Sequence, residues 1–261
     1  MIPRILSRPA GNPRARRAAR ALLALTSMAA LLSLDLPEAR ALPPLGVTGP
    51  ADADATAARV GALFAGGPDG GHFCTASVVR SAGRNLIATA AHCLARPEAT
   101  VFAPGYRDGA APYGLWRVTG VYVDPGWTRD GDADADIAFA TVAPADGARS
   151  GAVEDVVGGF PVAAAGQPQD VTVTVVGYPA TEDAPLRCAN ATSLFSPTQR
   201  RIDCPALSGG TSGSPWLAGG ALAGVLGGHE GGGTVPDVSY SAVMGDRALA
   251  LYRRAAARAV P

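Results

Sequence analysis

The sequence contains no lysine, because all 22 of its basic residues are arginine, and we draw no mechanism from this bias. It also has little of what builds a metal centre: three histidines, four cysteines and no C-x-x-C pair in 261 residues. Zinc sites usually take their cysteine ligands from such closely spaced pairs. We therefore expect neither a metal site at the cysteines nor a cofactor.

The apolar stretch near the N-terminus is too short for a transmembrane helix. Ala21 to Leu34 spans 14 residues, whereas a helix needs about 20 to cross a bilayer. The stretch follows the basic run Arg16 to Arg20 and precedes Ala39-Arg40-Ala41, a small-x-small cleavage pattern. This order is typical of a secretory signal peptide. We predict that residues 1–41 are removed and that the protein is secreted and extracellular, with no stable membrane association after cleavage; an uncleaved anchor is the alternative.

Excess positive charge is also missing once residues 1–41 are set aside. The remainder carries 15 Arg against 20 Asp and Glu, a formal net charge of −5, which gives no reason to expect nucleic acid or acidic membranes as partners. With 48% hydrophobic residues the chain can bury a sizeable core. An even number of cysteines in an oxidising compartment predicts two disulfides, and spacing alone permits three pairings. The cysteines are Cys74, Cys93, Cys188 and Cys204.

The organisation of the remaining chain is that of an all-β protein. Residues 42–58 are rich in Pro, Ala and Asp, so we interpret them as a pro-segment or flexible arm, with order beginning near Val60. From there, short apolar or alternating runs recur between Gly, Pro and Asp clusters, which is typical of a β-barrel or sandwich. One helix is predicted, Asp246 to Ala259, from its apolar periodicity. The predicted strands are Val60–Phe64, Cys74–Val79, Leu86–Ala90, Leu115–Val123, Ile137–Val142, Val171–Val176, Ser214–Leu217, Ala221–Leu226 and Val238–Val243.

Three short stretches carry residues suited to catalysis. The first contains a histidine, and the second is an acidic turn. Thr89-Ala-Ala-His92-Cys93 follows a strand-like run, and histidine suits general-base chemistry near neutral pH. The acidic turn Asp130 to Asp136 leads into an apolar strand, and an aspartate there can accept a histidine ring N–H and stabilise the imidazolium. The four alternating aspartates leave calcium binding open, although Ala135 and Thr141 stand where an EF-hand needs Gly and Glu.

The third stretch, Gly209-Gly-Thr-Ser212-Gly-Ser-Pro-Trp216, places a serine between glycines. Such a turn can expose the hydroxyl and let nearby N–H groups converge on a substrate carbonyl. An ordinary Gly/Ser loop is the alternative.

In chain order, T-A-A-H-C at 89–93, D-I-A at 136–138 and G-T-S-G-S-P at 210–215 resemble the histidine, aspartate and serine motifs of the chymotrypsin-type serine peptidases. The spacings of 44 and 76 residues between His, Asp and Ser suit two lobes with the site at their junction. The resemblance implies an all-β fold of two six-stranded antiparallel β-barrels with a C-terminal helix. It also implies a peptidase domain over residues 59–261, with the boundary between the lobes at about 145–165.

The resemblance assigns roles by position. Ser212 is the expected nucleophile, His92 the general base, and Asp136 its orienting partner, with Asp134 as a fallback for Asp136. The N–H groups of Gly210 and Ser212 are expected to form an oxyanion hole.

The implied function is a secreted serine endopeptidase, a monomer that cleaves protein or peptide substrates through an acyl-enzyme intermediate. The resemblance also implies a Cys74–Cys93 disulfide, which leaves Cys188 with Cys204. A catalytically silent binding protein on the same barrel is the main alternative. A lipase or esterase is less well supported, since Ser214 stands where the G-x-S-x-G motif requires glycine.

Departures from the trypsin-like pattern bear on activation and on the aspartate. Thr211 stands where trypsin-like members have the Asp that pairs with a new N-terminal amine, and we find no convincing Ile-Val-Gly-Gly start. We therefore do not expect the usual zymogen switch, and we group the chain with bacterial secreted relatives that also replace this Asp. Gly227 stands where many relatives have a serine that touches the catalytic Asp, which removes one support for Asp136.

The strand that should line the specificity pocket leaves the substrate preference open. Glu-preferring relatives tend to have histidine where Leu226 stands, so an acidic preference is not supported unless His229 substitutes. Ala206 aligns with the pocket-floor Asp of trypsin, whereas Asp237 aligns with a pocket glycine, where a carboxylate would pair with a substrate Arg or Lys. We predict Asp237, Gly227 and His229 as substrate-binding residues and hypothesise a preference for a basic residue before the cleaved bond (P1). A solvated turn Asp is the alternative.

Overall fold

The computed structural model describes residues 44–145, 151–164 and 171–258. The predicted signal peptide, residues 1–41, lies outside the described residues. In the part of the chain that is described, no helix is long and apolar enough to cross a membrane.

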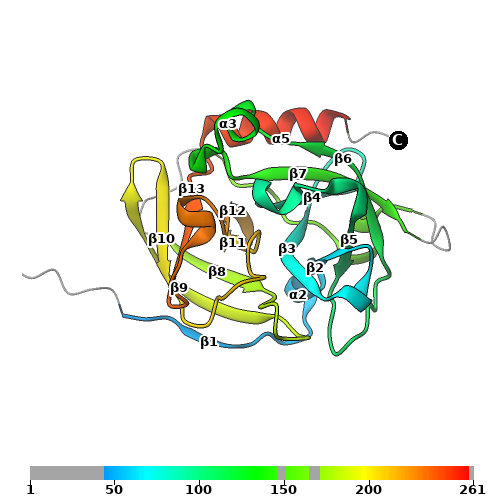
Figure 1. The fold of residues 1–261 in the computed structure, drawn as a ribbon, viewed down its shortest axis with the longest axis horizontal. Helices are drawn as coiled ribbons and strands as arrows, with labels where there is room; N and C mark the ends of the chain where they lie inside the picture. Colours follow the sequence, from blue (N-terminus) through cyan, green and yellow to red (C-terminus); the bar gives the residue numbers. More distant parts are fainter. Residues whose placement is uncertain (1–43, 146–150, 165–170, 259–261) are drawn as a thin grey trace, which may run out of the picture. The chain divides into compact units, whose positions relative to one another are not determined.

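The first lobe is a closed barrel of six antiparallel strands (Figure 1). The strands pair in the order β2-β3-β4-β7-β6-β5, so each has two neighbours. Their bounds are β2 Val60–Ala65, β3 His72–Val79, β4 Leu86–Thr89, β5 Thr100–Pro104, β6 Trp116–Tyr122 and β7 Ala138–Pro144. Strand β3 is buried at every position except Phe73, and its polar residues His72, Thr75 and Ser77 are buried with the apolar ones.

The second lobe is an open, barrel-like sheet. Six strands follow one another in the order β12-β11-β8-β9-β10-β13. Their bounds are β8 Thr172–Gly177, β9 Leu186–Ser196, β10 Gln199–Asp203, β11 Pro215–Ala218, β12 Ala221–Val225 and β13 Val238–Ala242. The two end strands meet without a regular ladder: the Gly227 N–H donates to the Tyr240 carbonyl at 2.9 Å, and the Val225 N–H donates to Ser241 Oγ at 3.1 Å. The predicted fold of two six-stranded lobes is confirmed, with one barrel closed and one open.

Ordered structure begins earlier than expected, so the expectation that it starts near Val60 is wrong. Strand β1 (Val47–Pro50) pairs antiparallel with the first half of β9, and helix α2 (Ala55–Ala58) is capped by Asp54. Strand β9 is long: its first half pairs with β8 and its second half with β10, which leaves one edge free for β1. Main-chain hydrogen bonds at a sheet edge need no apolar side chains, and Val47 is 87% exposed. The composition of this segment therefore does not reveal that it forms a strand and a helix.

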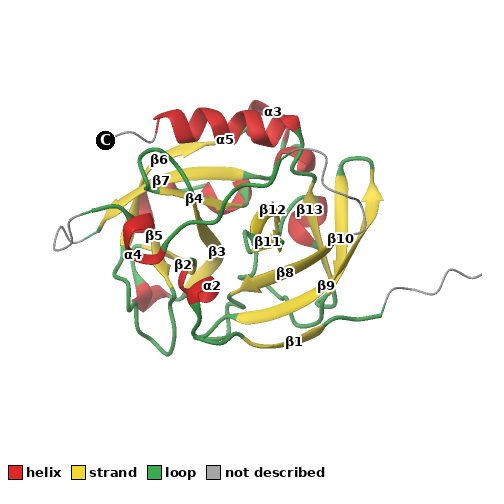
Figure 2. Cartoon of the chain, turned by 180° about the vertical axis from the view of Figure 1, so that it is seen from behind, coloured by secondary structure: helices red, strands yellow, loops and turns green. Residues whose placement is uncertain are grey.

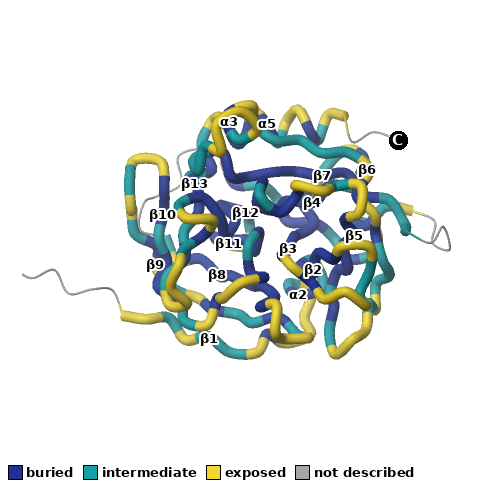
Figure 3. Tube along the Cα trace, viewed as in Figure 1, coloured by how far each residue is buried: buried dark blue, intermediate teal, exposed yellow. Residues whose placement is uncertain are grey.

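The predicted C-terminal helix is confirmed as α5, Asp246–Arg258. It lies beside β6 and β7 of the first lobe in both views (Figures 1 and 2), and it buries Ala248, Leu249, Leu251 and Ala255. The strand interiors of both lobes are buried, whereas the tip of the β9–β10 hairpin is exposed (Figure 3). The remaining short helices are η1 Pro68–Gly70, η2 Ala91–Leu94, η3 Pro97–Ala99, α3 Pro125–Asp130, η4 Ala133–Ala135, α4 Val153–Val157 and η5 His229–Gly232.

Candidate active site

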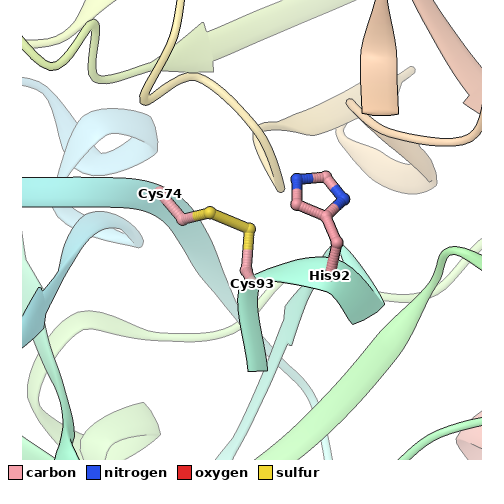
Figure 4. A group of neighbouring side chains, drawn as sticks. All are labelled: Cys74, His92 and Cys93. Carbon is pink, nitrogen blue, oxygen red and sulfur yellow. A yellow bond between two sulfur atoms is a disulfide. The ribbon is translucent and has the colours of Figure 1, made fainter. Parts of the chain in front are cut away.

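His92 lies on η2, directly after β4 ends at Thr89. Its neighbour Cys93 forms a disulfide with Cys74 on β3, so the segment is fixed covalently to the barrel beside the imidazole (Figure 4). Although the two sulfurs and the ring are close enough to suggest a metal group, the sulfurs are bonded to each other and are not thiolate ligands. The second disulfide joins Cys188 to Cys204, as the predicted pairing requires.

A buried carboxylate orients the His92 ring. Asp136 Oδ2 lies 2.8 Å from His92 Nδ1, and Asp136 Oδ1 accepts the main-chain N–H of His92 at 2.9 Å. The Asp136 side chain is fully buried, whereas 28% of the His92 side chain is exposed. Two bonds to one residue fix the ring with Nδ1 toward the carboxylate and leave Nε2 for chemistry. The Trp127 ring lies nearby, with its centroid 6.4 Å from that of His92.

A main-chain donor replaces the serine that the sequence lacks at Gly227. The Gly228 N–H donates to Asp136 Oδ2 at 2.8 Å. Gly228 has φ 82° and ψ −125°, a conformation that favours glycine. The expectation that Gly227 removes a support for Asp136 is therefore corrected, because the next residue supplies one. A main-chain N–H carries no signature in the sequence, and nothing there could have revealed it.

Two other aspartates of the acidic turn, Asp132 and Asp134, have hydrogen-bond partners of their own. Asp132 Oδ1 accepts the Asp134 N–H at 3.0 Å and caps η4, while its Oδ2 accepts from Arg247 Nη1 at 2.8 Å. Asp134 Oδ1 accepts from Gln199 Nε2 at 2.7 Å, so the fallback residue Asp134 does not take the place of Asp136. Asp132 and Asp134 therefore each have separate hydrogen-bond partners within the protein.

Ser212 lies in a tight turn between the lobes. Its carbonyl accepts the N–H of Thr75 at 2.7 Å, and Thr75 Oγ1 donates to the Gly210 carbonyl at 3.0 Å. Thr75 is the neighbour of Cys74, so the barrel wall that carries the disulfide also holds the serine turn. Within the turn, Thr211 Oγ1 donates to the Ser208 carbonyl at 2.6 Å.

Gly213 brings the serine turn against the histidine segment. It has φ +84°, and a Cβ at this position would lie 2.2 Å from Thr89 Oγ1 and 3.1 Å from the main-chain N of Ala90. Only glycine permits this approach, which brings Ser212 next to the segment that carries His92. Neither the Gly210 N–H nor the Ser212 N–H has a protein acceptor among the described residues.

Comparison with known proteins agrees with this geometry. The profile of the trypsin-like peptidase domain matches residues 74–225, more than half of the chain. The chain belongs to this family. No curated protein sequence matches it at a significant level.

Solved structures give the same result for this trypsin-like peptidase. The protease Anisep from Arthrobacter nicotinovorans has a TM-score of 0.68 at 26% identity, over 81% of this chain and 100% of that one. The thermostable serine protease AL20 from an extremophilic microorganism has a TM-score of 0.67 at 28% identity, over 78% of this chain and 100% of that one. A Glu endopeptidase in complex with MPD has a TM-score of 0.66 at 18% identity, over 82% and 98% of the two chains, a likeness of fold alone.

A cavity of about 170 Å³ opens beside Ser212 in the trypsin-like peptidase. Asp237 is not among the residues that line it; it is exposed in the turn before β13. The hypothesis that Asp237 selects a basic substrate residue stays a prediction, and its exposed position also fits the alternative of a solvated turn aspartate. The lining residues that are described carry no charge: Leu207, Ser208, Gly209, Thr211, Ser212, Leu226, Gly231, Gly232, Gly233, Thr234, Val235 and Pro236.

His229 and Gly227 also lie outside this lining. The His229 ring stacks in a partly exposed aromatic group, with its centroid 4.6 Å from that of Phe195 and 4.9 Å from that of Tyr240. Gly227 instead lies against Asp136, since a Cβ there would be 2.8 Å from Oδ2. Their predicted contact with substrate stays a prediction.

Proposed function

We propose that this trypsin-like peptidase is a serine endopeptidase in which Ser212, His92 and Asp136 form the catalytic triad. The observation that carries the proposal is the bond between His92 Nδ1 and the buried Asp136 Oδ2, at 2.8 Å. Peptide hydrolysis needs a hydroxyl, a base and an orienting carboxylate together. Two contacts between the lobes support the proposal: Thr75 of the first lobe bonds to the Ser212 carbonyl, and Gly228 of the second lobe bonds to Asp136.

The proposed reaction begins with attack of Ser212 Oγ on the substrate carbonyl carbon. His92 Nε2 takes the hydroxyl proton as the Oγ–C bond forms, while Asp136 stays ionised and stabilises the imidazolium. The N–H groups of Gly210 and Ser212 would bind the oxyanion. Collapse of the resulting tetrahedral intermediate breaks the C–N bond, and His92 gives its proton to the leaving amine. Water then attacks the acyl-enzyme while His92 takes its proton. The bond to Ser212 Oγ breaks, His92 returns the proton to that oxygen, and the acid product leaves.

We also propose that the enzyme acts outside the cell on proteins or peptides. Its two disulfides, Cys74–Cys93 and Cys188–Cys204, suit an oxidising compartment, and residues 1–41 have the pattern of a signal peptide. The uncharged lining of the cavity beside Ser212 favours an uncharged substrate side chain there, since a buried charge without a partner is costly. Peptide substrates with Arg, Lys, Glu, Phe or Leu before the cleaved bond test this preference.

Fluorophosphonate labelling of the exported protein tests the proposed function. We expect wild type to be labelled at Ser212, the Ser212→Ala variant to be unlabelled, and the Ser193→Ala variant on β9 to be labelled like wild type. An unlabelled wild-type protein with a processed N-terminus would favour the alternative, a catalytically silent binding protein on this fold.

A further inference from the structure

Gln199, the first residue of β10, is a buried amide that the triad does not use. It is 4% exposed, yet its side chain makes three hydrogen bonds, all directed to segments around Asp136. We propose that Gln199 is a positioning residue that holds the His92–Asp136 pair in its reactive geometry. This proposal rests on the proposed function of the triad.

One end of the amide holds the turn that precedes Asp136. Gln199 Nε2 donates to the Ala133 carbonyl at 3.1 Å and to Asp134 Oδ1 at 2.7 Å. Both acceptors lie in η4, and the Asp136 N–H bonds to the same Ala133 carbonyl at 3.3 Å. Both protons of the amide are thus used to fix the three residues before the carboxylate.

The other end of the amide holds the main chain that donates to Asp136. Gln199 Oε1 accepts the His229 N–H at 3.2 Å. His229 follows Gly228, whose N–H donates to Asp136 Oδ2 at 2.8 Å. The amide oxygen is packed so closely that a Cβ on Gly228 would lie 2.3 Å from it. One side chain therefore spans the two segments, from different lobes, that determine where the carboxylate lies.

The chemistry of this position calls for an amide. A glutamine offers two donors and an acceptor, which matches a carbonyl, a carboxylate and an N–H. Glutamate at the same place would bring a second negative charge against Asp134 and could not donate when ionised. Leucine has nearly the same shape but would remove this hydrogen-bond partner from three partly buried polar groups.

Kinetics of Gln199→Leu and Gln199→Glu test the proposal, with Thr141→Val as a matched control. Thr141 is also buried, on β7, and its hydroxyl bonds to Thr119 Oγ1 at 3.0 Å, away from the site. We expect kcat to fall on the order of tenfold to 10²-fold in both Gln199 variants, as for small misplacements of reacting groups. KM should change less than about threefold, because the substrate contacts are retained. The control should lose stability but keep kcat.

Two further measurements separate positioning from a general loss of stability. The low-field proton NMR signal of the His92 ring N–H shared with Asp136 should shift or broaden in the Gln199 variants and not in Thr141→Val. Combining Gln199→Glu with Asp134→Asn exchanges donor and acceptor in the 2.7 Å bond. Because this regains one hydrogen bond, kcat of the double variant should be at least about threefold higher than that of Gln199→Glu alone. If Gln199→Leu does not fold, this pair decides the question.

The proposal is overturned if folded Gln199 variants keep the kcat of Thr141→Val, or if the change appears in KM alone. Absence of rescue in the double variant would also count against it. An inactive, unlabelled wild type would instead overturn the proposed function, so the two failures are distinguishable.

Discussion

The first lobe closes its sheet by strand pairing, whereas the end strands of the open sheet in the second lobe are joined only by single hydrogen bonds. Every strand of the first barrel has two paired neighbours. In the second lobe, β12 and β13 are joined through the bonds at Gly227 and Val225, and β1 covers part of the edge of β9. His92 and Asp136 come from the regular lobe, while Ser212 and the cavity belong to the irregular one. The proposed acid–base pair thus comes from segments that adjoin regularly paired strands, and an irregular turn carries the proposed nucleophile.

The two lobes are coupled through a few buried groups. Thr75 of the first barrel bonds to Gly210, Ser212 and the N–H of Tyr178. Gly228 of the second lobe bonds to Asp136 of the first. Changes at these couplings should reduce activity, whereas changes within one lobe should reduce stability.

The largest effect is expected at Gly228, where the second lobe supports the carboxylate of the first. In Gly228→Ala, the new Cβ would meet Gln199 Oε1 at 2.3 Å and the N–H would leave Asp136. We expect kcat/KM to fall on the order of 10²–10³-fold. This is less than the ~10⁴-fold loss of rate that follows replacement of a triad aspartate by asparagine. Steady-state hydrolysis of a peptide ester measures this.

Gly219→Ala is the control for the strain of a positive φ. Gly219 has φ +55°, lies between β11 and β12, and a Cβ there would meet nothing within 4 Å. We expect a stability loss of about 1–2 kcal/mol from the left-handed backbone with no loss of activity. Equal activity of the two variants would refute the coupling through Gly228.

Removing each disulfide compares the lobes directly. The sequence separations are 19 residues for Cys74–Cys93 and 16 for Cys188–Cys204, so loop entropy predicts similar stability losses, about 3 kcal/mol each. Only the paired Cys74→Ala and Cys93→Ala change should also lower kcat, because Cys93 adjoins His92. Activity measured below the unfolding transition, with stability from denaturant titration, tests this. A loss of kcat in the Cys188→Ala, Cys204→Ala variant alone would contradict it.

How far the strands could be predicted from the sequence depends on whether each one carries an apolar run. Buried strands of the closed barrel have apolar runs, and the periodicity of α5 needs no tertiary context, so both could be predicted. Strands β9 and β10 were not predicted, because neither has an apolar run: β9 is partly exposed, and β10 reads Gln199-Arg-Arg-Ile-Asp203 although four of its five residues are buried. Strand β5 was missed as well. Short apolar runs are ambiguous without their partners.

The site residues divide in a similar way. Side-chain chemistry in short motifs indicated His92 and Ser212, and position before an apolar strand indicated Asp136. Gly228 supports Asp136 through a main-chain contact. Gln199 bonds to one segment at least 65 residues earlier in the chain and to another 30 residues later. Neither follows from local sequence. Asp237, predicted as a pocket residue from its alignment, is not among the residues that line the cavity, because alignment in a turn does not fix which way the turn faces.

Removal of the β1 segment should have a moderate effect confined to stability. A protein that begins at Ala51 lacks the pairing of Val47–Pro50 with β9, which we expect to cost about 2 kcal/mol, since each main-chain bond contributes about 1 kcal/mol. Activity at low temperature should be retained. Val47→Ala serves as control, because the side chain is 87% exposed. Full activity loss on removal would mean that β1 supports the site itself.

The smallest effect is expected at Arg247, which ties α5 to the acidic turn of the first lobe. Its Nη2 lies 2.5 Å from Asp124 Oδ1 and its Nη1 lies 2.8 Å from Asp132 Oδ2. Hydrogen bonding to this guanidinium lowers the pKa of both carboxyls below the ordinary value of 3.8 and raises the pKa of Arg247. Since 44% of the Arg247 side chain is exposed, solvent screens the network, and Arg247→Gln should cost only about 0.5–1 kcal/mol at pH 7.

The pH dependence of that loss distinguishes an ionic contribution from packing. A carboxyl whose pKa is lowered in the folded state contributes stability above its unfolded pKa, and this contribution is lost as pH falls through the folded pKa. The difference in unfolding free energy between wild type and Arg247→Gln should therefore be constant near neutral pH and shrink below pH 3.8. Urea titrations at pH 7 and at about pH 3 measure it. An unchanged difference at low pH would assign the loss to packing of the long side chain on the turn, and the connection between α5 and the first lobe would then be apolar.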